Sequence, residues 1–416
     1  MKETKEKRWR IMPGQPTTES ELSTALGVHP IVAKLLVNRG ITTVAAGTEF
    51  LHGTLDTLLD PFGLKGMTEA VAAIEKALAA KEPIVVYGDY DVDGITATSL
   101  LYRFLKKCDA QVSYYIPERQ SEGYGLNAEA LEHIIEQGAK LVITVDCGIS
   151  SHDIVAGVKD RLPMIITDHH NAPEIIPNSV AVINPKQPGC LYEDKNLSGV
   201  GVAFKLCAAL DDCTPEEMLD YCGDLAAVGT VADVMPLTGE NRTLVKAGLR
   251  QLQQTDRPGL MALLEEVGLA GKPVTAENVS YAIAPRINAA GRMDSAVTAL
   301  QLVLCEDEDR AVELAHKLSD INIQRQETEM EIVKAAQELL DARSTYGGTG
   351  LGMSVFAEAL SEAQGIDLAF DNYREDIRLG HKKIFYSADI CRKVVDQEGV
   401  EHSIPPDDDV QSQFVT

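Results

Sequence analysis

Five short apolar runs, rich in β-branched residues and separated by segments of helical period, constrain the fold of this chain more than any other feature. The runs span residues 84–89, 111–117, 140–146, 163–170 and 179–185. Between them, residues 95–108 and 127–138 carry apolar side chains at the i, i+3, i+4 spacing of an amphipathic helix. Strands that alternate with helices pair in parallel, and the helices cover both faces of the sheet. We therefore predict an α/β fold built on a parallel β-sheet flanked by helices.

The regions on either side of this α/β segment have different patterns. Residues 18–80 have the apolar period of several short helices, and residues 312–343 that of one long polar helix. From these changes we predict four regions: a helical N-terminal region (1–80), a catalytic α/β domain (81–310), a long linking helix (311–343) and a divergent C-terminal segment (344–416) with a disordered tail.

The charge of the chain argues against a general attraction to nucleic acid. The formal net charge is −25, so any binding of nucleic acid has to be local, and metal ions can assist it. The eight cysteines form no CxxC pair, which indicates reduced thiols rather than a disulfide framework. Neither an N-terminal signal segment nor an apolar run of transmembrane length is evident. We expect a cytoplasmic protein that is not associated with a membrane.

Carboxylates and imidazoles follow the predicted strands at the points where these strands end. The residues concerned are Asp89, Asp91, Asp93, Asp146, Asp168, His169, His170 and, after a later apolar stretch, Asp233. Ligands of open α/β sheets bind at the carboxyl ends of the strands, so we expect these side chains to converge. Taken singly, an Asp after a strand is more often a helix cap or turn residue, and a lone His is more often a hydrogen-bonded structural residue. The coincidence of four segments favours a functional site.

Carboxylates gathered in this way repel one another unless cations lie between them. Mixed carboxylate and imidazole ligands suit Mn²⁺, and also Mg²⁺ or Zn²⁺. Two cations that share a bridging carboxylate can activate a water and hold a phosphoryl group. The pattern therefore indicates a metal centre for phosphoryl chemistry.

Four motifs resemble those of a known family. GDYDVDG (88–94), VDCG (145–148), TDHH (167–170) and ADVMPL (232–237) are similar to the motifs of the DHH phosphoesterase superfamily. Within it, IPERQSEGYGL (116–126), LSGVGVAFKL (197–206) and APRINAAGRMDSA (284–296) resemble segments of the RecJ-type exonucleases. The resemblance covers roughly residues 8–343. It implies a 5′-to-3′ exonuclease of DNA repair and recombination that hydrolyses single-stranded DNA with two divalent cations, Mn²⁺ or Mg²⁺.

The resemblance also implies roles for individual residues. It assigns the metal ligands to Asp91, Asp93, Asp146, His169 and Asp233. Asp91 and Asp93 would ligate different cations, and Asp146 would bridge the two. His169 and Asp233 would complete the site that holds Asp93.

Three further residues complete the expected catalytic machinery. Asp89 would ligate a cation or hold a water, and His170 would contact the scissile phosphate. Asp168 would lie behind the ligands and orient an imidazole through its ring N–H.

The expected substrate contacts lie in segments that we predict to be loops or helix starts. They are Arg119, Tyr124, Gly199, Gly201, Arg286 and Arg292. Arginine suits phosphate, a tyrosine ring can stack on a base, and the glycines open a helix whose N–H groups can face a phosphate. For each residue alone, a surface or structural role explains the sequence equally well, including close helix packing at Gly201.

The C-terminal part departs from the family pattern. After residue 344 we find neither the glycine-rich GGH-type motif nor an oligonucleotide-binding barrel, so we expect both domains to be lacking. Three functions stay open: the exonuclease, another DHH hydrolase acting on short oligonucleotides, cyclic dinucleotides or pyrophosphate, and an inactive homologue that binds DNA or a partner. The expected partners are single-stranded DNA, a single-strand-binding protein and a helicase, and we expect a monomer.

Overall fold

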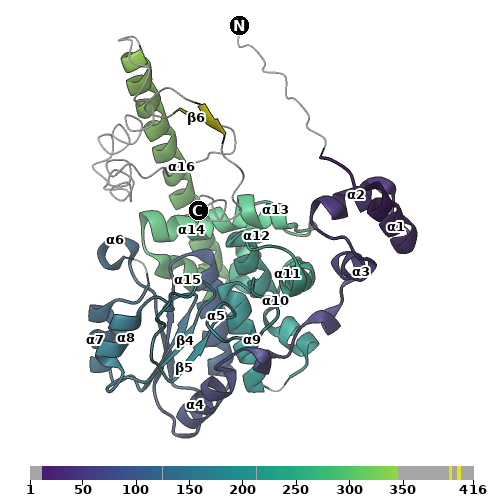
Figure 1. The fold of residues 1–416 in the computed structure, drawn as a ribbon. Coiled ribbons are helices and arrows are strands. Elements are labelled where there is room, and N and C mark those ends of the chain that lie inside the picture. The colour runs from purple at the N-terminus through teal and green to yellow at the C-terminus, as the bar shows by residue number, and fades with distance from the viewer. Residues whose placement is uncertain (1–11, 124, 212, 345–392, 396–400, 404–416) are drawn as a thin grey trace. The chain divides into compact units, whose positions relative to one another are not determined.

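A five-stranded parallel sheet forms the centre of the α/β part of the chain. The computed structural model describes residues 12–123, 125–211, 213–344, 393–395 and 401–403 (Figure 1). The strands of the sheet are β1 (Ile84–Gly88), β2 (Val112–Tyr115), β3 (Leu141–Val145), β4 (Met164–Thr167) and β5 (Ala181–Ile183). Their order is β2-β1-β3-β4-β5, and all neighbours run parallel. The predicted fold class is thus confirmed.

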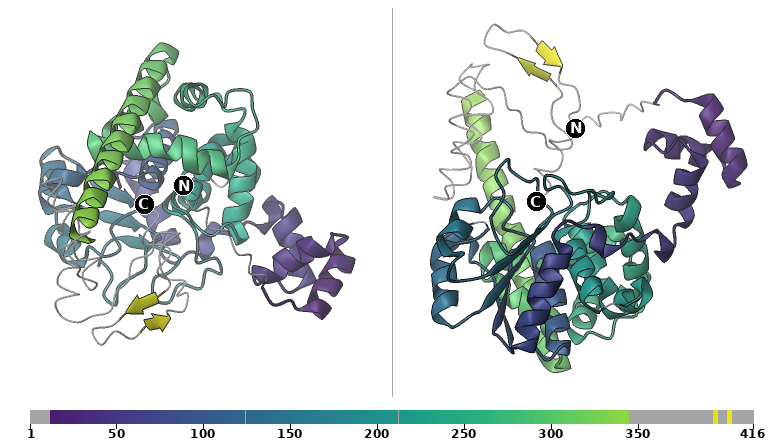
Figure 2. Two further views of the ribbon diagram at one scale, coloured as in Figure 1. Left: turned by 90° about the horizontal axis from the view of Figure 1, so that it is seen from above. Right: turned by 60° about the horizontal axis from the view of Figure 1, so that its bottom comes forward.

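Helices cover both faces of this sheet, which explains why its central strands consist of apolar residues throughout. On one face lie α7 (Ala128–Glu136) and α8 (His152–Val158) (Figure 2). On the other lie α4 (Met67–Ala79), α5 (Val92–Lys107) and α9 (Gly199–Asp211), and α10 (Pro215–Ala232) packs on α5 and α9. Every residue of β1 and β3 is buried as a result.

Side chains from alternate strand positions form the core between the sheet and the helices α7 and α8. Val85 and Tyr87 of β1 pack there with Leu131 and Ile134 of α7 and Val155 of α8. Each such apolar side chain contributes roughly 1.5–3 kcal/mol to stability when it is fully buried. This packing holds the carboxyl ends of the strands rigidly, and the polar residues that follow those ends are held with them.

Three short helices precede α4 and the sheet, in the region where the sequence predicts several helices. They are α1 (Pro16–Leu26), α2 (Pro30–Asn38) and α3 (Val44–His52), and they are followed by the 3-10 turns η1 (Leu55–Thr57) and η2 (Pro61–Gly63). A proline begins α1 and α2, where its missing N–H costs nothing, and the Thr43 side chain caps α3. Leu22 of α1 and Ala33 and Val37 of α2 form a small core between these two helices.

The remaining elements follow α10 in sequence. They are α11 (Gly239–Leu252), α12 (Pro258–Glu266), α13 (Ala276–Asn278), the π-helical turn η3 (Val279–Ile283), α14 (Ala284–Met293), α15 (Ala296–Leu304), α16 (Glu308–Ser344) and the antiparallel pair β6 (Lys393–Val395) and β7 (Glu401–Ser403). The short α6 (Arg119–Glu122) follows β2. The long helix α16 confirms the long helix predicted for residues 311–343, and its linking role stays a prediction. Most of the predicted C-terminal segment lies outside the described residues.

The chain divides into two compact units. The first comprises residues 1–256 and 269–280, and the second comprises residues 257–268 and 281–416. The domain boundaries expected from the sequence remain predictions. None of the seven cysteines among the described residues forms a disulfide, and no helix in this part of the chain is long and apolar enough to span a membrane.

Candidate metal centre

The strand ends of the first unit bring the acidic residues to one edge of the sheet. Asp89 follows β1, Asp146 follows β3 and Asp168 follows β4. Because these strands are parallel neighbours, their carboxyl ends lie side by side. Asp233 reaches the same place from the C-terminal end of α10. The convergence expected from the sequence therefore occurs.

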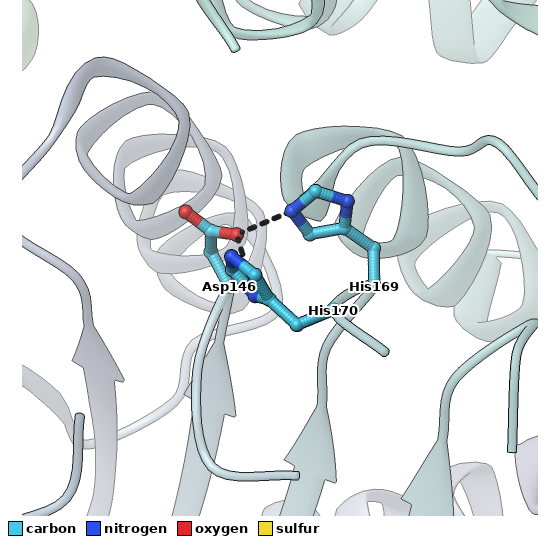
Figure 3. A group of neighbouring side chains, drawn as sticks. All are labelled: Asp146, His169 and His170. Atoms are coloured by element: carbon cyan, nitrogen blue, oxygen red, sulfur yellow. Dashed lines mark ion pairs between the residues drawn. The ribbon is translucent and has the colours of Figure 1, made fainter. Parts of the chain in front are cut away.

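Within this cluster, three sets of ligand atoms each lie within 4.8 Å of one another. They are Asp93, His169 and Asp233; Asp89, Asp91 and Asp146; and Asp146, His169 and His170. The first two sets share no residue, which leaves room for two cations. The third set, drawn in Figure 3, places Asp146 against both histidines. Since Asp146 belongs to the second set and His169 to the first, this contact joins the two sets.

Asp146 lies at the middle of the cluster. Its Oδ1 is 3.0 Å from Nε2 of His169 and 4.0 Å from Nδ1 of His170 (Figure 3). The backbone of Asp146 is left-handed, with φ at 61°, a conformation that non-glycine residues adopt uncommonly and that often marks functional sites.

Asp168 belongs to none of the three ligand sets, and its carboxylate is taken up by hydrogen bonds within the protein. Its carboxylate accepts hydrogen bonds from the backbone N–H groups of Ile149, His169 and His170, at 2.7–3.0 Å. Its Oδ1 also lies 2.7 Å from Nδ1 of His170. Although burial acts against the charged ring, this contact and the charge of Asp168 raise the pKa of His170 to about 9. Asp168 is therefore placed to orient the His170 imidazole.

The Asp93 carboxylate is held by the first turn of α9. Its Oδ2 accepts from the N–H of Gly199 at 2.6 Å, and its Oδ1 accepts from the N–H of Val200 at 2.8 Å. The N–H of Gly201 donates to Oγ of Ser198 at 3.1 Å. The expectation that Gly199 and Gly201 present N–H groups to a substrate phosphate is therefore wrong. These buried N–H groups already have acceptors inside the protein.

Glycine at position 199 permits this close approach. A Cβ atom there would lie 2.5 Å from both Cβ and Oδ1 of Asp146. In the same way, a Cβ atom on Gly229 of α10 would lie 2.8 Å from Oδ1 of Asp93. Two helices thus reach the metal-ligand candidates at positions where no side chain fits.

The carboxylates of the cluster carry strongly perturbed pKa values. Burial, and after it the charge of a neighbouring carboxylate, raises the pKa of Asp89, Asp93 and Asp146 well above the ordinary value. The same two causes raise the pKa of Asp233 to about 7. Ionised carboxylates are thus destabilised here as long as no cation lies between them.

Several buried polar atoms confirm that the cluster fits cations. Within the described residues, Oδ1 of Asp89, Oδ1 of Asp146 and Nε2 of His169 have no hydrogen-bond partner. Burial lowers the pKa of His169 to about 3, so its ring is neutral and offers a lone pair. Buried polar atoms without partners are costly, and lone pairs that face one another are the arrangement that a cation relieves.

Comparisons with known proteins agree with a metal centre at this edge of the sheet. The model of the "DHH family, N-terminal domain" matches residues 83–230. A solved structure described as exonuclease RecJ bound to manganese is 39% identical, with a TM-score of 0.61, over 72% of this chain and 78% of that one. This chain belongs to the RecJ family of DHH proteins.

Other RecJ proteins extend this result. The single-stranded-DNA-specific exonuclease RecJ of Bacillus subtilis (strain 168) is 42% identical over 335 residues, which are 80% of this chain and 42% of the relative. The crystal structure of RecJ from Thermus thermophilus in complex with Mn²⁺ is 35% identical, with a TM-score of 0.68, over 86% of this chain and 52% of that one. The chain thus spans about half the length of these relatives.

The arginines expected to contact the substrate lie on helices, not in loops. Arg119 is the first residue of α6, is exposed, and lies over the ring of Tyr90 at 5.3 Å. Arg286 and Arg292 lie on α14 of the second unit. Arg286 donates to Oγ of Ser319 at 2.9 Å and to the carbonyl of Ala282 at 2.7 Å, and its contact with a substrate stays a prediction.

Tyr124 and Lys186 are the remaining residues of interest. Tyr124 lies outside the described residues. Lys186, which the sequence reasoning missed, is half-buried after β5, and its charge acts on Asp168, Asp233 and His169. The signal that could have found it is a basic residue soon after the fifth predicted strand, at the edge where the acidic residues gather.

Proposed function

We propose that this protein is a metal-dependent exonuclease that hydrolyses single-stranded DNA in the 5′-to-3′ direction, in DNA repair and recombination. The observation that carries the proposal is the pair of separate ligand sets, Asp93–His169–Asp233 and Asp89–Asp91–Asp146, with Asp146 also against His169. A centre of this kind suits an in-line attack on a phosphodiester. The RecJ relatives named as single-stranded-DNA-specific exonucleases support this substrate class.

In this proposal each cation is held by its own set of ligands. Asp93, His169 and Asp233 would hold one, and Asp89 and Asp91 would hold the other, with Asp146 shared between the two. Two bound divalent cations supply an activated water and neutralise the charge that develops on the phosphate. Mn²⁺ and Mg²⁺ both suit oxygen-rich ligand sets, and the imidazole favours Mn²⁺.

His170 differs from His169 in its access to solvent. The His170 side chain is 43% exposed, whereas that of His169 is 4% exposed. The contact of Asp168 with Nδ1 of His170 fixes the ring, and Nε2 lies on the opposite side of the imidazole from Asp168. We assign His170 to the scissile phosphate, where its N–H donates to an oxygen whose charge grows in the transition state.

The experiment that tests the proposal offers the purified full chain a panel of substrates. The panel holds 5′- and 3′-labelled single strands, duplex DNA, dinucleotides, cyclic dinucleotides and pyrophosphate, each with Mn²⁺, Mg²⁺ or excess EDTA. We expect hydrolysis of single strands from the 5′ end, with either cation and not with EDTA. An Asp146→Asn variant controls for a contaminating nuclease.

Other outcomes distinguish the alternative functions. Preferential hydrolysis of dinucleotides, cyclic dinucleotides or pyrophosphate would indicate another DHH hydrolase and contradict the exonuclease. Binding of single strands without hydrolysis of any substrate would indicate a homologue that only binds DNA. On the same basis as the activity, we propose that the protein is a cytoplasmic monomer that binds a single-strand-binding protein and a helicase. Light scattering would test the oligomeric state, and co-purification would test the partners.

A further inference from the structure

The metal centre is closed on one side and open on the other. The side chains of Asp93, Asp146 and His169 are at most 4% exposed. Those of Asp233 and His170 are 20% and 43% exposed, and Asp91 is also only partly buried. A substrate therefore reaches the centre from the side of Asp233 and His170, and any protein group that binds its phosphate has to lie there.

The segment after β5 lies at this open side. The backbone N–H of Asp168 donates to the carbonyl of Ile183 at 3.0 Å, which ties the two strand ends together. Asn184 then donates from Nδ2 to the carbonyl of His170 at 3.0 Å. Its Oδ1 accepts from the backbone N–H of Lys186 at 2.7 Å. One asparagine side chain thus connects the backbones of His170 and Lys186.

The ammonium group of Lys186 differs from those of two lysines that contact the same segment. Nζ of Lys195 donates to the carbonyls of Pro185 and Cys190, both at 2.9 Å, and Nζ of Lys65 donates to the carbonyl of Pro188 at 2.7 Å. Across the residues that the structure describes, Nζ of Lys186 has neither a hydrogen bond nor an ion pair within 4.0 Å, although the residue is half-buried. Lys195 and Lys65 are structural, and the donors of Lys186 remain available.

Electrostatics place the charge of Lys186 near the open side of the centre. Burial lowers the pKa of the Lys186 ammonium, and the nearby carboxylates of Asp233 and Asp168 act in the opposite direction. Conversely, Lys186 is among the charges that act on Asp233 and His169, after burial. The ammonium is thus near enough to influence three members of the cluster without contacting a carboxylate.

The net charge of the centre with two cations and a substrate bound favours a positive group such as this lysine. Five ligand carboxylates face two divalent cations, which leaves one excess negative charge when all five are ionised. A phosphodiester brings a second negative charge, and like charges in a partly buried site repel strongly. A positive group at the open side offsets this repulsion.

We infer that Lys186 is a phosphate-contacting residue, whose ammonium binds a non-bridging oxygen of the substrate phosphodiester at the open side of the metal centre. The inference rests on the proposed function, because it takes a phosphodiester as the substrate. The alternative role for Lys186 is to balance the charge of Asp233 in the metal-free protein. In that case the bound cations would repel the ammonium. Removal of Lys186 would then strengthen metal binding and leave DNA binding unchanged.

The test compares Lys186→Met with the wild-type chain and with Lys65→Met, which changes the net charge equally. Fluorescence anisotropy measures the binding of a labelled, phosphorothioate-linked single strand in Mn²⁺ over a series of KCl concentrations. We expect Lys186→Met to bind about tenfold more weakly, and the slope of log Kd against log salt to fall by about 0.7, the share of one phosphate contact on a single strand. Lys65→Met should bind like the wild type, and Lys186→Arg should keep most of the affinity.

Two further measurements complete the test. The midpoint of a Mn²⁺ titration followed by thermal unfolding should be the same or lower in Lys186→Met, which would exclude a damaged metal site. Equal DNA affinity and equal salt slope in Lys186→Met and the wild type would overturn the inference. A wild type that neither binds nor hydrolyses single strands would instead contradict the proposed function, so the two failures are distinguishable.

Discussion

Replacing Gly199 by alanine should damage the metal centre through a single methyl group. The added Cβ would lie 2.5 Å from Cβ and Oδ1 of Asp146, whereas ordinary contacts lie at 3.4–4 Å. The N–H of the same residue holds Asp93 at 2.6 Å. Neither neighbour is the end of a flexible chain, because Asp146 is buried and its backbone is left-handed. Either α9 or Asp146 has to move.

The distances give the size of the effect. Relief of the contact requires a displacement of about 1 Å, and misplacements of this size cost roughly 100-fold in rate at a catalytic site. Overpacking in a close-packed interior costs about 1–3 kcal/mol of stability. We therefore expect Gly199→Ala to lose roughly 100-fold in kcat/KM and to need more Mn²⁺ for half-maximal activity, while it still folds.

Gly201→Ala is the matched control on the same helix. Its Cβ would meet Oγ of Ser198 at 3.2 Å and Cδ2 of Leu197 at 3.4 Å, contacts that a shift of a few tenths of an ångström relieves. Steady-state hydrolysis of a labelled single strand, Mn²⁺ titration and thermal unfolding measure both variants. If Gly199→Ala matched Gly201→Ala in rate and in Mn²⁺ requirement, our account of how α9 positions Asp93 and Asp146 would be refuted.

Three further predictions concern the ligands themselves. Asp146→Asn should lower kcat by about three orders of magnitude, because it removes the bridging charge. It should also stabilise the metal-free protein in thermal unfolding. An undiminished rate would show that Asp146 is not the bridge. His169→Ala should be partly rescued by excess Mn²⁺ and His170→Ala should not, as activity against Mn²⁺ concentration would show; the reverse pattern would exchange the two roles. Mn²⁺ at about 100 times its Kd should raise the free energy of unfolding by about 2.7 kcal/mol in denaturant titrations, and no shift would contradict a folded-state cation site.

Much of the site could be predicted because its geometry follows from the order of strands. Runs of β-branched residues mark β1, β3 and β4, and parallel pairing brings the residues after them to one edge. Asp89, Asp146 and His169 therefore converge whatever the details of packing, and like charges brought together in this way indicate cations. The resemblance to the DHH motifs then indicates the chemistry.

The glycine segment shows where such reasoning stops. From the sequence, Gly199 and Gly201 open a helix and can serve a phosphate or a close packing contact. The structure shows that the α9 N–H groups are used by Asp93, more than 100 residues earlier in the chain. Contacts over such separations depend on where α9 lies against α5, which no local pattern encodes.

By itself, the sequence determined the parallel α/β fold, the convergence of the acidic residues and the family, because these follow from short-range periodicity and from the residue types at strand ends. Only the tertiary structure decided how the ligands are held and approached. The α9 N–H groups bind Asp93, Asp168 contacts and orients His170, and Lys186 lies at the open side. The physical reason is that strand pairing repeats along the chain, whereas burial, hydrogen-bond partners and access depend on how distant segments pack.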